Sequence, residues 1–181
     1  MTQLTVFAQD KPETPVLVTD DDRAMRAALA EIGVHLDRWT LQALPDDADA
    51  GQILTAYAPQ IDALKARGGY RTVDVASITP DHPDRAKMRG TFLDEHSHAE
   101  DEVRFFVRGG GLFTLHSAGR VWSLHCTAGD LINVPAGMAH WFDMGPEPCF
   151  TAIRLFTNPD GWVATFTGDD IASRFPRFVS A

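Results

Sequence analysis

The feature that most constrains the fold of this chain is a series of short apolar runs, separated by glycines, in its second half. After Thr91, segments rich in Val, Phe, Leu and Ile alternate with turns containing Gly109, Gly119 and Gly129. Such spacing is typical of antiparallel hairpins in a sandwich or barrel. We therefore expect a mainly β fold, with strands at Val103–Val107, Leu112–His116, Val121–Cys126, Leu131–Val134 and Phe150–Phe156.

The first 90 residues indicate a mixture of strands and helices. Short strands are expected at Leu4–Phe7, Val16–Thr19 and Leu36–Leu41. Apolar residues at helical spacing predict helices at Arg23–Ile32, Gly51–Arg67 and Asp81–Arg89, the second with a kink or break at Pro59. A short capped helix is expected after Gly168. Since no repeat or linker divides the chain, we expect one domain over residues 1–181, with strands and helices of 1–90 packed on a barrel core of 91–157, and a C-terminal segment over 158–181.

Charge and composition limit the classes of function. The chain has 16 Lys and Arg against 25 Asp and Glu, a formal net charge of −9, which disfavours binding to nucleic acid or to an anionic membrane. No stretch approaches the roughly 20 apolar residues that span a bilayer, and the N-terminus does not resemble a signal peptide. We expect a cytoplasmic protein. Cys126 and Cys149 lack CxxC spacing and are expected to be reduced core thiols.

The most specific chemical signal is a cluster of histidine and glutamate positions. His96 and His98 are two residues apart and project from the same face of a strand, and Glu102 keeps the same parity. A later strand runs to a Pro-x-Gly turn, and that turn delivers His140. Together they form a mixed nitrogen and oxygen donor set that suits iron, nickel, manganese or zinc. The remaining histidines are expected to be ordinary surface or core residues: His35, His82, His116 and His125.

The same positions match both signature motifs of the cupin superfamily. The first motif is met by Gly90, His96, His98, Glu102 and Gly109. The second is met by Gly129, Pro135, Gly137 and His140, with Met144 where the motif has Asn. More narrowly, the segments EHSHAEDEVRFFVRGGGLFTLH, DLINVPAGMAHWFDMG and FTAIRLFTNPDGWVATFTGDDIA, together with HLDRW, resemble the acireductone dioxygenase family of methionine salvage over nearly the whole chain.

This resemblance implies a cupin barrel (a double-stranded β-helix or jelly roll) with peripheral N-terminal helices. It also implies one Fe(II) or Ni(II) per chain, held by His96, His98, Glu102 and His140, and cleavage of an acireductone by O₂. In this family the iron form gives 4-methylthio-2-oxobutanoate and formate, whereas the nickel form gives 3-methylthiopropanoate, formate and carbon monoxide. The resemblance also favours a monomer.

Charge balance suggests roles for further residues. Three neutral imidazoles and one carboxylate leave a divalent ion with net charge about +1, which cannot neutralise a substrate dianion. Arg104 has the parity of Glu102, and we expect it to stabilise that dianion. Glu95 and Asp101 are expected to orient ligand imidazoles or help to capture the metal. Other expected substrate contacts are a second cation, Arg154, and aromatic residues that receive the methylthio tail: Phe92, Phe105, Phe142 and Trp162.

Two other classes of function remain open on the sequence alone. A metal-dependent cupin isomerase or decarboxylase would use the same four ligands with the ion acting as a Lewis acid and without O₂. A non-catalytic cupin would bind a small ligand tightly without turnover. Oxygen uptake on adding a reductone separates the first of these from a dioxygenase, and tight binding by metal-free protein would favour the second.

Overall fold

A computed structural model describes residues 1–158 and 162–179 and shows two antiparallel sheets. The seven-stranded sheet has the order β12-β5-β10-β7-β8-β1-β2, and the five-stranded sheet has the order β3-β9-β6-β11-β4. The strands are β1 (Gln3–Ala8), β2 (Pro15–Thr19), β3 (His35–Arg38), β4 (Thr72–Ile78), β5 (His96–Ser97), β6 (Glu102–Gly109), β7 (Gly111–Ser117), β8 (Arg120–Cys126), β9 (Asp130–Val134), β10 (Ala139–Asp143), β11 (Phe150–Phe156) and β12 (Thr165–Phe166).

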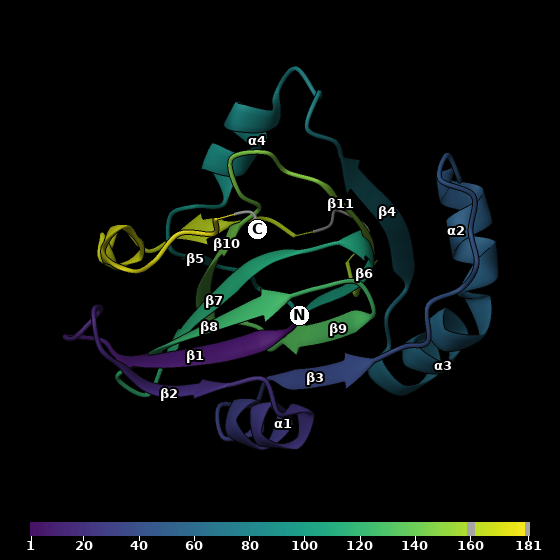
Figure 1. Ribbon diagram of the computed structural model, residues 1–181. Helices are drawn as coiled ribbons and strands as arrows, with labels where there is room; N and C mark the ends of the chain where they lie inside the picture. The colour runs from purple at the N-terminus through teal and green to yellow at the C-terminus, as the bar shows by residue number, and fades with distance from the viewer. Residues whose placement is uncertain (159–161, 180–181) are drawn as a thin grey trace.

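The two sheets enclose the main apolar core (Figure 1). Alternate residues of their strands meet in it, including Phe106 of β6, Phe113 of β7, Leu124 of β8 and Ile132 of β9, each with an exposed fraction of 0 %. Because side chains alternate across a strand, one residue in two points into this core. The predicted mainly β fold is confirmed, and the barrel is filled with side chains over most of its length.

The helices lie outside the barrel, as Figure 1 shows. They are α1 (Asp22–Ala30), α2 (Ala50–Ala56), α3 (Ala58–Gly68) and α4 (Arg85–Thr91). Ile53, Tyr57 and Ile61 of the α2–α3 segment pack on the outer face of β6, against Val103 and Phe105. Without these helices, that apolar face of the five-stranded sheet would be exposed to water.

The predicted helix over Gly51–Arg67 is divided at Tyr57 into α2 and α3. Pro59 lies in the first turn of α3, where its missing N–H costs no helical hydrogen bond. A capping box between Asp49 and Gln52 fixes the start of α2, since each side chain bonds to the other residue's backbone N–H. The expected break therefore occurs, but just before the proline.

Other boundaries differ from the sequence-based expectations. β4 and β10 were not expected as strands, although the sequence TVDVASI of β4 alternates in the way a strand does. The segment predicted as Leu36–Leu41 is a strand only over His35–Arg38, and the helix expected in the tail is a 3₁₀ turn, Ile171–Arg174. Both cysteines are free, but only Cys126 is a core thiol, because Cys149 is exposed.

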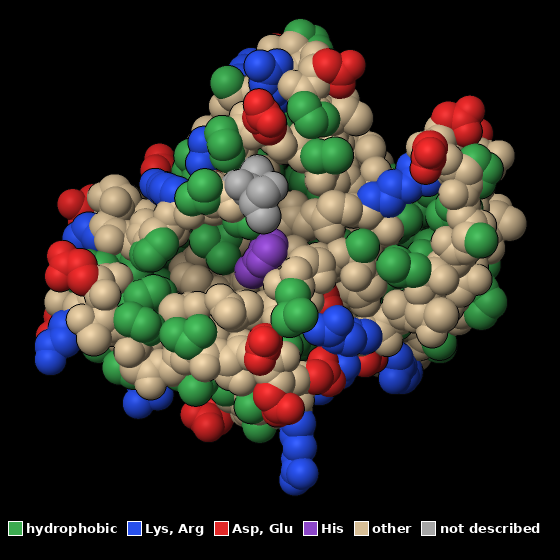
Figure 2. Space-filling model, viewed as in Figure 1, with side chains coloured by type: hydrophobic (Ala, Val, Ile, Leu, Met, Phe, Trp, Pro, Cys, Tyr) green, Lys and Arg blue, Asp and Glu red, His purple; other side chains and the backbone are tan. Residues whose placement is uncertain are grey.

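The surface carries mixed charge. On the face drawn in Figure 2, Lys and Arg side chains are scattered among Asp and Glu and do not gather into a broad basic patch. Among the described residues, no helix has the length and apolar character required to cross a membrane.

Candidate metal centre

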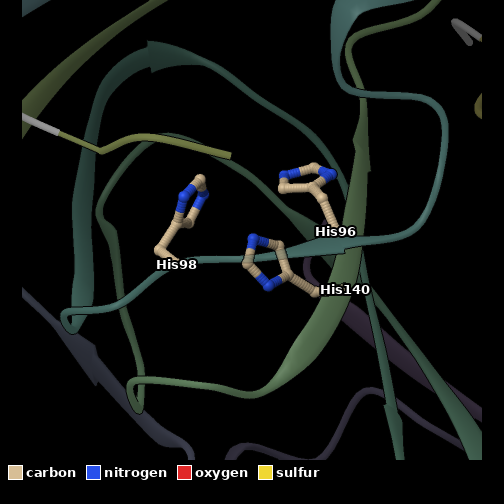
Figure 3. Close-up of side chains that lie close together, drawn as sticks. All are labelled: His96, His98 and His140. Atoms are coloured by element: carbon tan, nitrogen blue, oxygen red, sulfur yellow. The ribbon is translucent and has the colours of Figure 1, made fainter. Parts of the chain in front are cut away.

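Two neighbouring strands bring the three histidines together. His96 of β5 and His140 of β10 are directly paired across the sheet, and His98 follows β5 by one residue. Their rings point toward one another in Figure 3, and one ring nitrogen of each lies within 4.8 Å of the others. All three side chains are buried. The convergence of His140 with the two sequence-local histidines is thus set by strand pairing.

The turn before His140 is held in place by His98. Gly137 has a φ of 78°, a left-handed conformation that favours glycine, in the turn after Pro135. Its N–H donates to the carbonyl oxygen of His98 at 2.8 Å. The Pro-x-Gly motif therefore fixes the position of β10 relative to the segment that carries His96 and His98.

Backbone carbonyl groups orient all three imidazoles. The Nδ1 atoms of His96, His98 and His140 lie 2.8, 3.0 and 2.8 Å from the carbonyl oxygens of Asp94, Val163 and Met138. A carbonyl oxygen can only accept, so each Nδ1 carries the hydrogen. In its neutral form, a ring held in this way presents a lone pair on Nε2 to the shared space, which is the arrangement that a metal ligand needs.

Glu102, the first residue of β6, supplies a carboxylate beside these nitrogens. Its Oε2 atom lies 3.1 Å from Nε2 of both His98 and His140. Two lone pairs facing a carboxylate repel it unless a proton or a cation lies between them. One divalent ion bound by three Nε2 atoms and Glu102 satisfies all four groups, so the residues present fit such an ion.

The protonation states of the donors favour a cation. Burial lowers the pKa of His96 to about 4, so its ring is neutral at neutral pH. Burial alone would raise the pKa of Glu102, but the charge of Arg104 and the bonds from His140 and His98 hold it well below its usual range. Burial also opposes protonation of His98, but the adjacent Glu102 outweighs this and raises the His98 pKa. The carboxylate is thus ionised and attracts positive charge.

Arg104 lies next to Glu102 inside the barrel. Its Nη2 donates to Glu102 Oε1 at 2.9 Å, and the guanidinium carbon lies 4.6 Å from the centre of the Phe142 ring and 5.5 Å from that of Trp162. The residue is only 7 % exposed, and its Nε has no hydrogen-bond partner among the described residues. A buried N–H without a partner is costly, which indicates that a ligand completes this site.

A small enclosed cavity lies beside these groups. It has a volume of about 40 Å³ and is lined by the four donors, Arg104, Phe92, Phe142, Arg154 and Trp162. Larger grooves occur elsewhere on the described surface, such as one of about 430 Å³ along β1 and β8, but they lack a comparable cluster of buried charged groups. The chemistry therefore belongs to the small cavity.

Known proteins share both the sequence and the fold. The ARD/ARD′ family model matches residues 7–164. An acireductone dioxygenase of Marinobacter nauticus is 56 % identical over 99 % of this chain and 97 % of its own length, and one of a Synechococcus species is 56 % identical over 97 % and 98 %. The chain belongs to the ARD/ARD′ family.

A solved structure supports the assignment. An acireductone dioxygenase from Bacillus anthracis, with a cadmium ion in its active centre, superposes with a TM-score of 0.82 at 29 % identity. The match covers 92 % of this chain and 98 % of that one. The resemblance predicted from the motifs is thereby confirmed, as is the cupin barrel with peripheral helices.

Of the two roles expected of Glu95 and Asp101, the orientation of ligand imidazoles is wrong, because the Nδ1 atoms of the donor set bond to backbone carbonyls. A role in metal capture stays a prediction. Glu95 instead lies 2.6 Å from Nδ1 of His116 and accepts a hydrogen bond from the Thr167 hydroxyl at 2.7 Å. Asp101 accepts from the backbone N–H of Ala136 at 3.0 Å, in the turn before His140. Backbone carbonyls take the place that these two carboxylates were expected to fill.

Phe105 was expected to contact the substrate and does not line the cavity. It has the opposite parity to Glu102 and Arg104, so it points out of the barrel and packs on Trp39 and Tyr57, with ring centres 4.6 and 4.9 Å away. The alternation rule that identified Arg104 also predicts this orientation of Phe105. By contrast, Phe92, Phe142 and Trp162 lie at the cavity as expected.

Arg154 lines the cavity but already has a partner. It is directly opposite Arg104 in the pairing of β11 with β6, and opposite Asp74 in the pairing of β11 with β4. Its Nε and Nη2 donate to the two carboxylate oxygens of Asp74, at 2.8 and 2.6 Å. Asp74 was not expected at the site, because β4 was not recognised as a strand, and the register of β4 is what places it there.

Proposed function

We propose that this protein is a metal-dependent acireductone dioxygenase whose ion is bound by His96, His98, Glu102 and His140. The observation that carries the proposal is the cluster of His96, His98 and His140. The Glu102 carboxylate lies 3.1 Å from the last two of these, with Arg104 bonded to its other oxygen. The family membership and the 56 % identity to curated acireductone dioxygenases support it.

The charged residues at the site have different roles. When bound, a divalent ion supplies positive charge and coordination positions for two adjacent oxygens of an enediolate. The donor set contributes only one negative charge, so Arg104 provides the further cation that a substrate dianion requires. Its unpaired Nε–H is available to a substrate oxygen, and a charge-assisted hydrogen bond in a dry cavity is strong.

The cavity walls protect this chemistry from water. Phe92, Phe142 and Trp162 surround the charged groups, and the space left among them is about 40 Å³. Removing bulk water strengthens the attraction between Arg104 and a developing negative charge. Asp74 neutralises the charge of Arg154. Arg154 therefore adds a polar group to the cavity wall without adding a second unpaired charge.

The identity of the metal selects the product in this proposal. The nitrogen and oxygen donor set accepts several divalent metals, since the order of affinities alone does not select one. We propose Fe(II) or Ni(II), one per chain. The iron form would yield 4-methylthio-2-oxobutanoate and formate in methionine salvage, and the nickel form 3-methylthiopropanoate, formate and carbon monoxide. All four donors and Arg104 come from one chain, so the site needs no residue from a second subunit, and we propose a monomer.

The test is reconstitution of metal-free protein with Fe(II) or Ni(II), followed by anaerobic addition of an acireductone and then of O₂. The proposal predicts oxygen uptake and formate with both metals, and carbon monoxide with nickel alone. Conversion of the substrate without oxygen uptake would instead identify a metal-dependent isomerase. Tight binding of the compound without turnover by either form would indicate a non-catalytic cupin.

A further inference from the structure

An exposed aromatic ring lies at the rim of the metal centre. Phe166 of β12 is directly opposite His96 of β5, and its ring centre is 5.6 Å from that of His96. Residues directly opposite each other in a sheet project from the same face, so Phe166 points to the side that carries the metal ligands. It is nevertheless 53 % exposed and is not among the residues that line the cavity. Phe166 therefore contacts a residue of the cavity wall on one side and is open to solvent on the other.

The cavity is small for a whole substrate. Its volume of about 40 Å³ is far below the range of about 300–1,000 Å³ that is typical of small-molecule pockets. The donors and Arg104 that line it are buried, so an oxygen-rich head fits beside them and the remaining atoms of a longer substrate extend toward exposed residues. Phe92, which lines the cavity, also has its ring centre 5.8 Å from that of His96.

The segment that carries Phe166 is held firmly on the barrel. The Thr167 hydroxyl donates to the Glu95 carboxylate at 2.7 Å, and the Thr167 N–H donates to the Glu95 carbonyl at 3.1 Å. On the other side of Phe166, the Val163 carbonyl accepts from Nδ1 of His98. A large ring that is fixed in position and half-exposed beside a reactive site offers a preformed apolar contact.

We propose that Phe166 is a specificity-determining residue that receives the apolar tail of the substrate as it leaves the cavity. The inference rests on the proposed function and adds a residue to it. A thioether or alkyl chain gains from contact with an aromatic face, whereas a charged tail does not. Phe166 thus selects acireductones with apolar tails, while the metal ligands and Arg104 act on the head that all acireductones share.

The test uses a series of acireductones whose tails lengthen from methyl to propyl, together with the methylthioethyl compound. For the wild-type protein, kcat/KM rises by up to about fourfold for each added methylene that is buried on the ring. In Phe166→Ala this dependence on tail length is largely lost, while kcat/KM for the methyl compound stays within about twofold. Phe166→Leu, which keeps an apolar side chain, retains most of the dependence. Leu41→Ala removes another exposed apolar side chain, 48 % exposed and outside the site, and should leave the series unchanged.

Metal content is measured on every variant, because Phe166 also packs on a ligand. An equal loss of kcat/KM for all tails, with or without loss of metal, would assign Phe166 a structural role and overturn the inference. An unchanged dependence on tail length in Phe166→Ala would overturn it too, while leaving the proposed function intact. If the wild-type protein loaded with Fe(II) or Ni(II) turned over none of these compounds, the proposed function would fail and this inference with it.

Discussion

The two faces of strand β6 are equally buried and serve opposite purposes. On the inner face, Glu102 and Arg104 are 3 % and 7 % exposed and depend on charged partners. On the outer face, Val103 and Phe105 are 0 % exposed and belong to an apolar cluster with side chains of the α2–α3 segment, Trp39 and neighbouring strands. Burial alone therefore does not distinguish function from stability in this barrel, whereas the alternation of side chains along one strand does.

The energetics of the two faces differ in sign. Apolar side chains on the outer face stabilise the fold by roughly 1.5–3 kcal/mol for each large side chain removed from water. Buried charges on the inner face cost free energy unless each is fully paired. In the proposed metal-bound form, the cation offsets part of this cost, so binding of the ion should stabilise the folded protein.

The largest effect is expected from removal of a metal donor. His96→Ala removes one of the four proposed ligands. It should abolish stoichiometric metal binding and all dioxygenase activity, because the three remaining donors hold the ion poorly. Elemental analysis of purified protein checks the metal, and oxygen uptake checks the activity. His35→Ala, on the exposed side of β3, is the matched control and should retain both. Full metal content in the His96 variant would contradict the assignment of His96 as a metal ligand.

Arg104→Ala tests whether the inner face of β6 also stabilises the substrate dianion. This variant should retain one metal ion per chain but lose about a thousandfold in kcat, since the charge that stabilises the substrate dianion is removed. Arg104→Lys should recover part of the loss, because it restores the charge but not the planar guanidinium. Loss of the metal from Arg104→Ala would show that the residue supports Glu102 and does not act on the substrate.

Phe105→Ala probes the outer face two residues from Glu102. Truncating this fully buried ring should lower the free energy of unfolding by about 3–4 kcal/mol, as it opens a cavity beneath Trp39 and Tyr57. Denaturant unfolding measures this loss, and the folded variant should bind metal and turn over substrate with nearly wild-type kcat. A large fall in kcat at unchanged stability would place Phe105 at the site after all.

A smaller effect is expected at Asp143, which anchors α4 and the C-terminal segment to β10. Burial raises its pKa, but the bonds from Arg89, Gly145 and Phe178 outweigh this and lower it. The ionised form is therefore favoured by folding, and its contribution is present above about pH 3.8 and is lost as pH falls through the lower folded pKa. Asp143→Asn should cost about 2 kcal/mol at pH 7. The difference in unfolding free energy between wild type and variant should shrink below about pH 3.8; a constant difference down to pH 2 would contradict this.

The donor set could be predicted from sequence because it depends on local rules. His96, His98 and Glu102 share strand parity, and the turn at Gly137 delivers His140. The partners of Glu95 and Asp101 could not be predicted, because His116, Thr167 and Ala136 reach them through tertiary pairing. The expected substrate contact of Phe105 already disagreed with strand parity, which places Phe105 on the outer face. The pairing of Asp74 with Arg154 could not be predicted, because β4, which carries Asp74, was not predicted as a strand.

The proposed metal centre is best tested by a structure of the metal-loaded protein. We expect one ion at about 2.0–2.2 Å from Nε2 of His96, His98 and His140 and from a Glu102 oxygen, with Arg104 still on the other oxygen of that carboxylate. An ion bound elsewhere, or one that leaves the ring of His140 uncoordinated, would contradict it.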